Sequence, residues 1–115
     1  RGLGDVYKRQ VLESYESAVK RGAPILAEVI GYGFSSNGDH ISVPNVDGPK
    51  RSLQMAIKDA GIALEQISYI NAHATSTPVG DLNEAKAIAE VFEGHHPYVT
   101  STKSMTGHEM WVPVK

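Results

Sequence analysis

The stretch between residues 67 and 84 constrains the fold most strongly, because it carries three successive kinds of local signal. Apolar side chains run through Ile67–Ala72, and the run then stops at His73, three hydroxyl residues and Pro78. A proline disfavours the α region for the residue before it, so Thr77 is expected to be extended. The stretch therefore predicts a strand that ends in an extended, polar turn.

The end of the same stretch predicts a helix. Asp81 is placed as an N-cap that accepts from the free amides of the first turn, and Glu84 is placed to reach back to the N–H of Asp81 in a capping box. A strand, turn and helix in this order present His73 at the carboxyl end of the strand. In open α/β sheets, ligands bind at that end.

A second polar turn, at residues 100–108, follows a short predicted strand at Tyr98–Thr100. It also carries a histidine, His108, which follows Gly107, a residue that can adopt a positive φ or allow close backbone approach. Two strands that each end in a hydroxyl-rich turn with a histidine suggest one shared site, with His73 and His108 as its candidate residues.

Each candidate also has an ordinary structural explanation. A histidine at a strand end is more often a packing or capping residue, although neighbouring hydroxyls can line a polar ligand channel. Lys103 would usually be a surface charge, and Glu84 would serve only as a helix cap. The histidines lack the short spacing of a zinc site, and no G-x-S-x-G elbow of a serine hydrolase is present.

The rest of the chain predicts alternating helices and strands. Apolar residues spaced by three and four indicate helices, and short apolar runs indicate strands. In order, we expect a helix from Val11 that stops at Gly22, a strand at Ile25–Ile30, a loop over 35–48, a helix from Pro49 that ends at Gly61, the strand at Ile67–Ala72, a helix over Asp81–Phe92 and the strand at Tyr98–Thr100. This alternation favours a layered α/β sheet, and its few short strands suggest part of a larger domain.

Composition excludes several classes of protein. With 41% hydrophobic and 21% charged residues, the 115-residue chain is not expected to be disordered. A formal net charge of −2 gives no basic face for nucleic acid, and no apolar run approaches the ~18 residues of a membrane span. The chain has no cysteine, so it contains neither a disulfide nor a thiolate nucleophile. We expect a cytoplasmic location.

The two turns together resemble a known family. His-Ala-Thr-Ser-Thr-Pro at 73–78 with Gly-Asp at 80–81, followed by Ser-Thr-Lys-Ser-Met-Thr-Gly-His at 101–108, is similar to the C-terminal half of an elongating β-ketoacyl-[acyl carrier protein] synthase. The resemblance implies an α/β, partial thiolase-like layered fold, with helices packed on a short mixed sheet. We expect residues 1–10 to be a non-native leader, 11–111 the partial domain and 112–115 a truncated tail.

The resemblance also implies roles for individual residues. His73 and His108 match the histidine pair that hydrogen-bonds the thioester carbonyl of malonyl-carrier protein and supports its decarboxylation. Loss of CO2 leaves an enolate, and a donor aimed at such developing charge is worth on the order of 3 kcal/mol. Lys103 matches the family lysine and Glu84 the acidic residue that pairs with it as a buried ion pair.

Substrate and partners follow from the same resemblance. Thr75 and Thr77 match the hydroxyls that contact the phosphopantetheine arm of acyl carrier protein. The implied reaction is a decarboxylative Claisen condensation of malonyl-carrier protein with an acyl thioester, by a homodimeric parent that needs no metal or other cofactor. The family's nucleophilic cysteine comes from the N-terminal half, so this chain alone is not expected to catalyse condensation.

Two alternatives stay open at this point. The first alternative is a fragment of a polyketide ketosynthase or chain-length factor, although the Ser-Thr-Pro form at 76–78 and the Lys-Ser-Met-Thr-Gly-His string favour the fatty-acid type. The chain could also be a non-enzymatic module that binds carrier protein or acyl chains.

Overall fold

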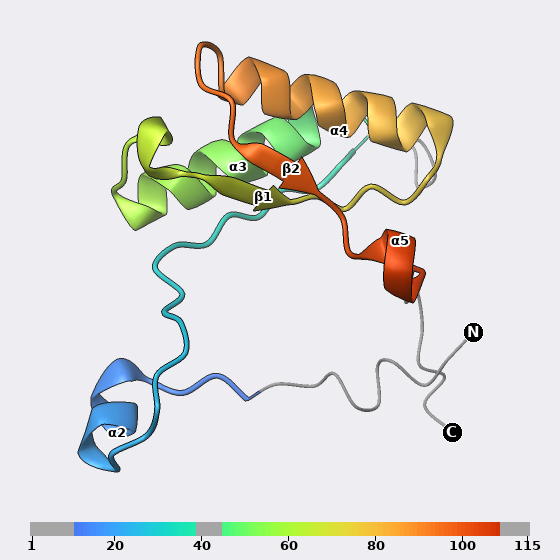
Figure 1. The fold of residues 1–115 in the computed structure, drawn as a ribbon. Helices are drawn as coiled ribbons and strands as arrows, with labels where there is room; N and C mark the ends of the chain where they lie inside the picture. The colour runs from blue at the N-terminus through green and yellow to red at the C-terminus, as the bar shows by residue number, and fades with distance from the viewer. Residues whose placement is uncertain (1–10, 39–44, 109–115) are drawn as a thin grey trace.

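The structure of the protein is a computed structural model that describes residues 11–38 and 45–108. The predicted leader at 1–10, the predicted tail at 112–115 and the middle of the predicted loop lie outside the described residues. Two long helices and two strands form a body, with one short helix before it in the chain and another after it (Figure 1). The elements are, in order, α2 (Tyr15–Lys20), α3 (Asp47–Ala60), the 3-10 turn η1 (Leu64–Gln66), β1 (Tyr69–Asn71), α4 (Pro78–Val91), β2 (Tyr98–Thr100) and α5 (Lys103–Thr106).

The sheet is small and parallel. β1 pairs with β2, so that Ile70 lies opposite Val99 and Asn71 opposite Thr100, and α4 forms the crossover between the two strands. Two long helices on a parallel sheet confirm the predicted α/β class. Within the described ranges the sheet is parallel and not mixed.

The strand predicted at Ile25–Ile30 is wrong. These residues are extended, but no backbone hydrogen bond joins them to another described segment, and a strand requires such a ladder. The following residues pack on α3 through two glycines: a Cβ at Gly31 would lie 2.6 Å from the carbonyl oxygen of Ala56, and one at Gly33 would overlap the backbone of Ser52. The missing side chains allow the segment to lie directly on the helix backbone.

The predicted C-terminal end of α3 is correct, but α3 begins at Asp47, two residues before the predicted Pro49, and the predicted start of α4 is also wrong. α3 ends at Gly61, which adopts the left-handed conformation (φ 65°) expected of a helix C-terminus. α4 begins at Pro78 with an extended Thr77 as its N-cap, because proline suits the first helical position, where its missing N–H costs nothing. Asp81 therefore sits inside the helix, and the predicted capping box is absent.

The few buried apolar side chains lie where α4 meets the rest of the body. Ala87, Val91 and Phe92 are 0–8% exposed, and Ala72 at the end of β1 is 8% exposed. An ion pair between Lys50 of α3 and Glu90 of α4 (2.6 Å) links the two helices, and its hydrogen bond, with the charge of Glu90, raises the pKa of Lys50.

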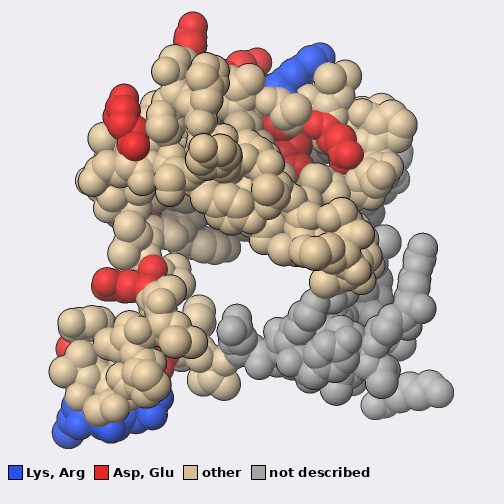
Figure 2. All heavy atoms as spheres, viewed as in Figure 1, with Lys and Arg blue, Asp and Glu red and all other residues tan. Residues whose placement is uncertain are grey.

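The region before α3 is different, because it exposes its apolar side chains. α2 lies apart from the body at the end of an extended segment (Figure 1), and Val11 and Leu26 are 95% and 96% exposed. Ser14 caps α2 by accepting from the N–H of Ser17, which explains why the helix begins after the predicted Val11. On the face shown in Figure 2, basic side chains gather mainly at the α2 end, whereas acidic ones are scattered over the body. None of the helices in the described ranges is long and apolar enough to cross a membrane.

Candidate functional site

The turn that follows β1 is fixed by two carboxylates of α4. Glu84 accepts a hydrogen bond from the backbone N–H of His73 and another from that of Ala74, each 2.7 Å long. Asp81 accepts from the backbone N–H of Ser76 at 3.1 Å. Hydrogen bonds to a charged acceptor are the stronger kind, so α4 determines the path of this turn.

The backbone of the turn is strained. Ala74 has a φ of 34° and Ser76 a φ of 67°, a region that side chains with a Cβ rarely occupy. Each such residue costs roughly 1–2 kcal/mol in the left-handed region. Strain of this kind persists where surrounding contacts over-determine the conformation, and it clusters at functional sites. The two carboxylates are the contacts that do so here.

The hydroxyl groups of the turn form a pair. The Oγ1 atoms of Thr75 and Thr77 lie 3.0 Å apart in a hydrogen bond. Gly80 makes room for them, because a Cβ at this position would overlap Thr77 Oγ1. The two hydroxyls therefore occupy a space that a larger residue at position 80 would fill.

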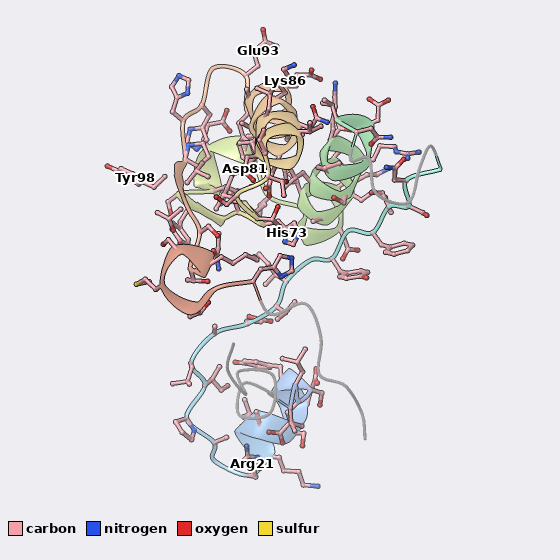
Figure 3. All side chains as sticks on the ribbon, turned by 90° about the vertical axis from the view of Figure 1, so that its right-hand side faces the viewer. Arg21, His73, Asp81, Lys86, Glu93 and Tyr98 are labelled. Atoms are coloured by element: carbon pink, nitrogen blue, oxygen red, sulfur yellow. The ribbon has the colours of Figure 1, made fainter. Side chains whose placement is uncertain are left out.

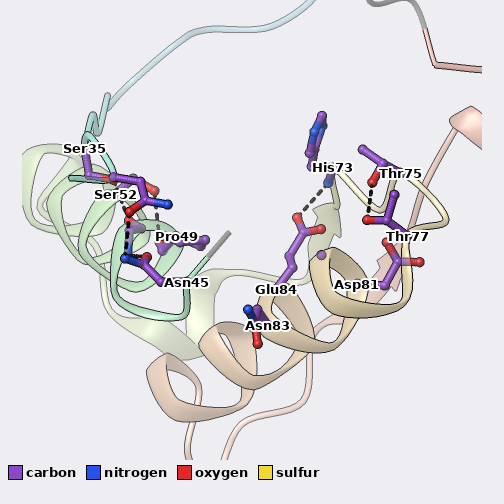
Figure 4. Close-up of a pocket in the computed structure, with 13 residues that line it drawn as sticks. Ser35, Asn45, Pro49, Ser52, His73, Thr75, Thr77, Asp81, Asn83 and Glu84 are labelled. Carbon is purple, nitrogen blue, oxygen red and sulfur yellow. Dashed lines mark hydrogen bonds between the residues drawn. The ribbon is translucent and has the colours of Figure 1, made fainter. Parts of the chain in front are cut away.

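A pocket of about 540 Å³ lies between this turn and the start of α3. Figure 4 shows the turn on one side of it and Ser35, Asn45 and Pro49 on the other. Its volume falls within the range of small-molecule sites. Most of the residues that line it have polar side chains, and two of them are carboxylates: Ser35, Asn37, Asn45, Gly48, Pro49, Ser52, His73, Thr75, Thr77, Gly80, Asp81, Asn83 and Glu84.

The structure brings the two candidate histidines together. The ring centroids of His73 and His108 are 5.1 Å apart, and the rings meet edge to face at 82°. Because β1 and β2 are parallel neighbours, their carboxyl ends share one edge of the sheet and place both turns there. His108 Nδ1 is buried and has no hydrogen-bond partner within the described residues. Figure 3 shows His73 at the edge of the body opposite Lys86 and Glu93.

The ion pair expected between Glu84 and Lys103 is not formed. Both carboxylate oxygens of Glu84 accept from the backbone of the first turn. Lys103 lies in the second turn, where it begins α5, and makes no ion pair with another described residue. The predicted partner of Glu84 is therefore wrong, because this carboxylate holds the backbone of the first turn and not the Lys103 ammonium.

Sequence reasoning missed the far wall of the pocket. Asn45 accepts from the N–H of Gly48 (2.9 Å), its amide donates to Asn37 Oδ1 (3.0 Å), and the hydroxyl of Ser35 donates to the carbonyl of Gly48. These contacts join the two ends of the predicted loop in front of α3. Asparagine and serine near glycine signal local turns, but that signal does not reveal that the turn faces His73.

Comparison with known proteins gives a consistent result. The family described as "Beta-ketoacyl synthase, C-terminal domain" matches residues 26–111. The chain is 53% identical over 102 residues to 3-oxoacyl-[acyl-carrier-protein] synthase 2 of Staphylococcus aureus, covering 85% of this chain and 25% of that protein. It is 49% identical over 111 residues to the protein of the same name from Vibrio cholerae, covering 92% and 27%. The chain thus spans about a quarter of the length of these relatives.

Solved structures agree with the sequence relatives. The ishigamide ketosynthase/chain length factor superposes with a TM-score of 0.80 at 46% identity, over 84% of this chain and 24% of that one. A type II PKS acyl-carrier protein in complex with its ketosynthase bound to the hexaketide gives a TM-score of 0.77 at 42% identity, again over 84% and 24%. Both similarities lie well above the level at which only the fold is shared.

Proposed function

The chain belongs to the β-ketoacyl synthase family, whose C-terminal domain matches residues 26–111, and we propose that it supplies the decarboxylation site of a fatty-acid elongating 3-oxoacyl-[acyl-carrier-protein] synthase. The observation that carries this proposal is the pairing of the His73 and His108 rings, 5.1 Å apart, beside a polar pocket. Two imidazoles at adjacent strand ends suit a reaction in which one oxygen atom gains negative charge.

In the proposed reaction, the malonyl thioester on acyl carrier protein loses CO2, and the electron pair of the broken bond moves into an enolate. His73 and His108 donate hydrogen bonds to the enolate oxygen and lower the barrier, each by on the order of 3 kcal/mol. The enolate carbon then attacks the carbonyl of an acyl thioester, so that a C–C bond forms, the C–S bond breaks and the thiolate leaves. The acyl group is carried by a cysteine outside this chain, which itself has none.

The remaining candidate residues support these steps. Thr75 and Thr77 line the pocket and would hydrogen-bond the phosphopantetheine arm of the carrier protein. Glu84 holds the backbone of His73, and Lys103 would place positive charge beside the second turn. The relative solved with its carrier protein supports the same kind of partner for this chain. The proposed parent is a cytoplasmic homodimer that uses no metal or other cofactor.

A polyketide ketosynthase or chain-length factor is the second candidate, since the two solved relatives described above are of that kind at 42–46% identity. The fatty-acid proposal takes precedence because the named 3-oxoacyl synthases are 49–53% identical.

A hybrid protein tests the proposal. In it, residues 26–111 of this chain replace the matching stretch of the Staphylococcus aureus relative, hereafter the hybrid. We expect it to release CO2 from malonyl-carrier protein and to form 3-oxoacyl-carrier protein from saturated acyl primers. A folded hybrid that does neither would refute the proposal, and one that accepts only poly-β-keto chains would favour the polyketide alternative.

A further inference from the structure

We propose that Asp81 is a positioning residue that sets the affinity of the pocket for the carrier's pantetheine arm by holding the Thr75 and Thr77 hydroxyls in place. The inference rests on the proposed function for the identity of the ligand. Asp81 is not assumed to touch the arm, and its effect passes through the backbone of Ser76.

Asp81 makes a hydrogen bond to each end of the Ser76–Thr77 segment. Its side-chain Oδ1 accepts from the N–H of Ser76 at 3.1 Å, and its own backbone N–H donates to the carbonyl of Thr77 at 2.9 Å. The two contacts hold the short segment from Ser76 to Thr77 against the first turn of α4. Figure 4 shows Asp81 directly beside Thr77.

The residue that Asp81 holds lies between the two threonines. Ser76 has a positive φ of 67°, which turns the chain so that Thr75 and Thr77 bring their hydroxyls to 3.0 Å from each other. A serine left to itself prefers a negative φ, and that change would separate the two hydroxyls. The Asp81 carboxylate therefore selects the conformation in which both hydroxyls line the pocket.

A pair of hydroxyls 3.0 Å apart suits an amide-rich ligand. A hydroxyl donates one hydrogen bond and accepts others, so a bonded pair can offer one donor and one acceptor to the same peptide-like group. The pantetheine arm contains two amides. Disordering the pair removes about one net hydrogen bond, which corresponds to roughly a tenfold loss of affinity.

The test measures binding of pantetheine itself to the hybrid by NMR titration, and separately the KM and kcat for malonyl-carrier protein. We expect Asp81→Ala to raise the Kd and the KM by about tenfold. The kcat should change less than about twofold, because the backbone of His73 is held by Glu84 and His108 lies in the other turn. Asp81→Asn keeps an oxygen acceptor for Ser76 and should recover most of the affinity.

A second variant separates positioning from general damage to the fold. In Asp81→Ala combined with Ser76→Gly, glycine adopts the positive φ without support, so at least half of the lost affinity should return. Glu93→Ala, an exposed change just beyond the far end of α4, is the matched control and should leave Kd and KM unchanged.

Three results would overturn the inference: an unchanged Kd in Asp81→Ala, a loss confined to kcat, or no recovery in the double variant. The proposed function fails separately, through absence of CO2 release in the unmodified hybrid. In that event the pantetheine titration still decides whether Asp81 positions the two hydroxyls.

Discussion

The turn after β1 and the turn after β2 both carry a histidine and both contain backbone with positive φ, yet they are stabilised differently. In the first turn the positive φ falls on Ala74 and Ser76, which are not glycines, and charged side chains of α4 hold the chain. In the second turn it falls on Gly107 (φ 77°), which tolerates it without support.

Hydrogen-bond lengths show the same difference. In the first turn, the N–H groups of His73 and Ala74 each donate to Glu84 at 2.7 Å. In the second turn, the side-chain acceptors are more distant: Thr102 N–H donates to Asn71 Oδ1 and Lys103 N–H to Ser101 Oγ, each at 3.4 Å, and the shorter bonds, such as that from Gly107 N–H to the Lys103 carbonyl (2.9 Å), are local to α5. Contacts of 3.4 Å lie beyond the usual range of N–H···O bonds. Within the described residues, the first turn is therefore a preorganised support for its histidine, and the second depends more on its own glycine.

The largest expected effect is that of removing the second histidine. His108→Ala in the hybrid should lower the rate of CO2 release from malonyl-carrier protein by about 10²- to 10³-fold, because one donor to the enolate oxygen is lost. His96→Ala is the control, since His96 is exposed in the loop after α4. An unchanged rate of CO2 release in His108→Ala would refute the role assigned to this ring.

The next largest effect is the loss of stability when Glu84, which holds the first turn, is replaced. Glu84→Ala should lower the free energy of unfolding by about 3 kcal/mol, because two backbone N–H groups lose a charged acceptor. Glu84→Gln offers one oxygen and should lose about half as much. Urea unfolding of the hybrid measures both, with Glu90→Ala as control because Glu90 is an exposed carboxylate that pairs with Lys50 across α3 and α4. Equal stability of Glu84→Ala and Glu90→Ala would show that the first turn does not depend on α4.

The smallest effect concerns the positive φ angles of Gly107 and Ser76. Gly107→Ala should destabilise the hybrid by about 1–3 kcal/mol, because a Cβ is forced into a region that suits glycine. Ser76→Gly should change stability by less than about 1 kcal/mol, since relief of strain and added chain freedom nearly cancel. Thermal unfolding compares the two variants. If Gly107→Ala is as harmless as Ser76→Gly, the two turns are stabilised more alike than the structure indicates.

Local patterns were sufficient for much of the fold. The apolar spacing predicted both long helices, and Gly61 marked the end of α3 correctly. The strand at Ile25–Ile30 failed because an apolar run does not state whether a partner strand is available. The predicted capping box failed because Pro78 began the helix three residues earlier.

The sequence by itself determined the two long helices, the two paired strands, the family and the two histidine turns, because each depends on neighbouring residues or on motifs that are contiguous in the chain. Only the tertiary structure decided that Glu84 binds the backbone of His73, 11 residues away, and not Lys103. It also decided that the His73 and His108 rings meet and that Ser35 and Asn45 line the other side of the pocket. The physical reason is that a carboxylate bonds whichever donor the packing of helix on sheet brings nearest, and that choice is not encoded in spacing along the chain.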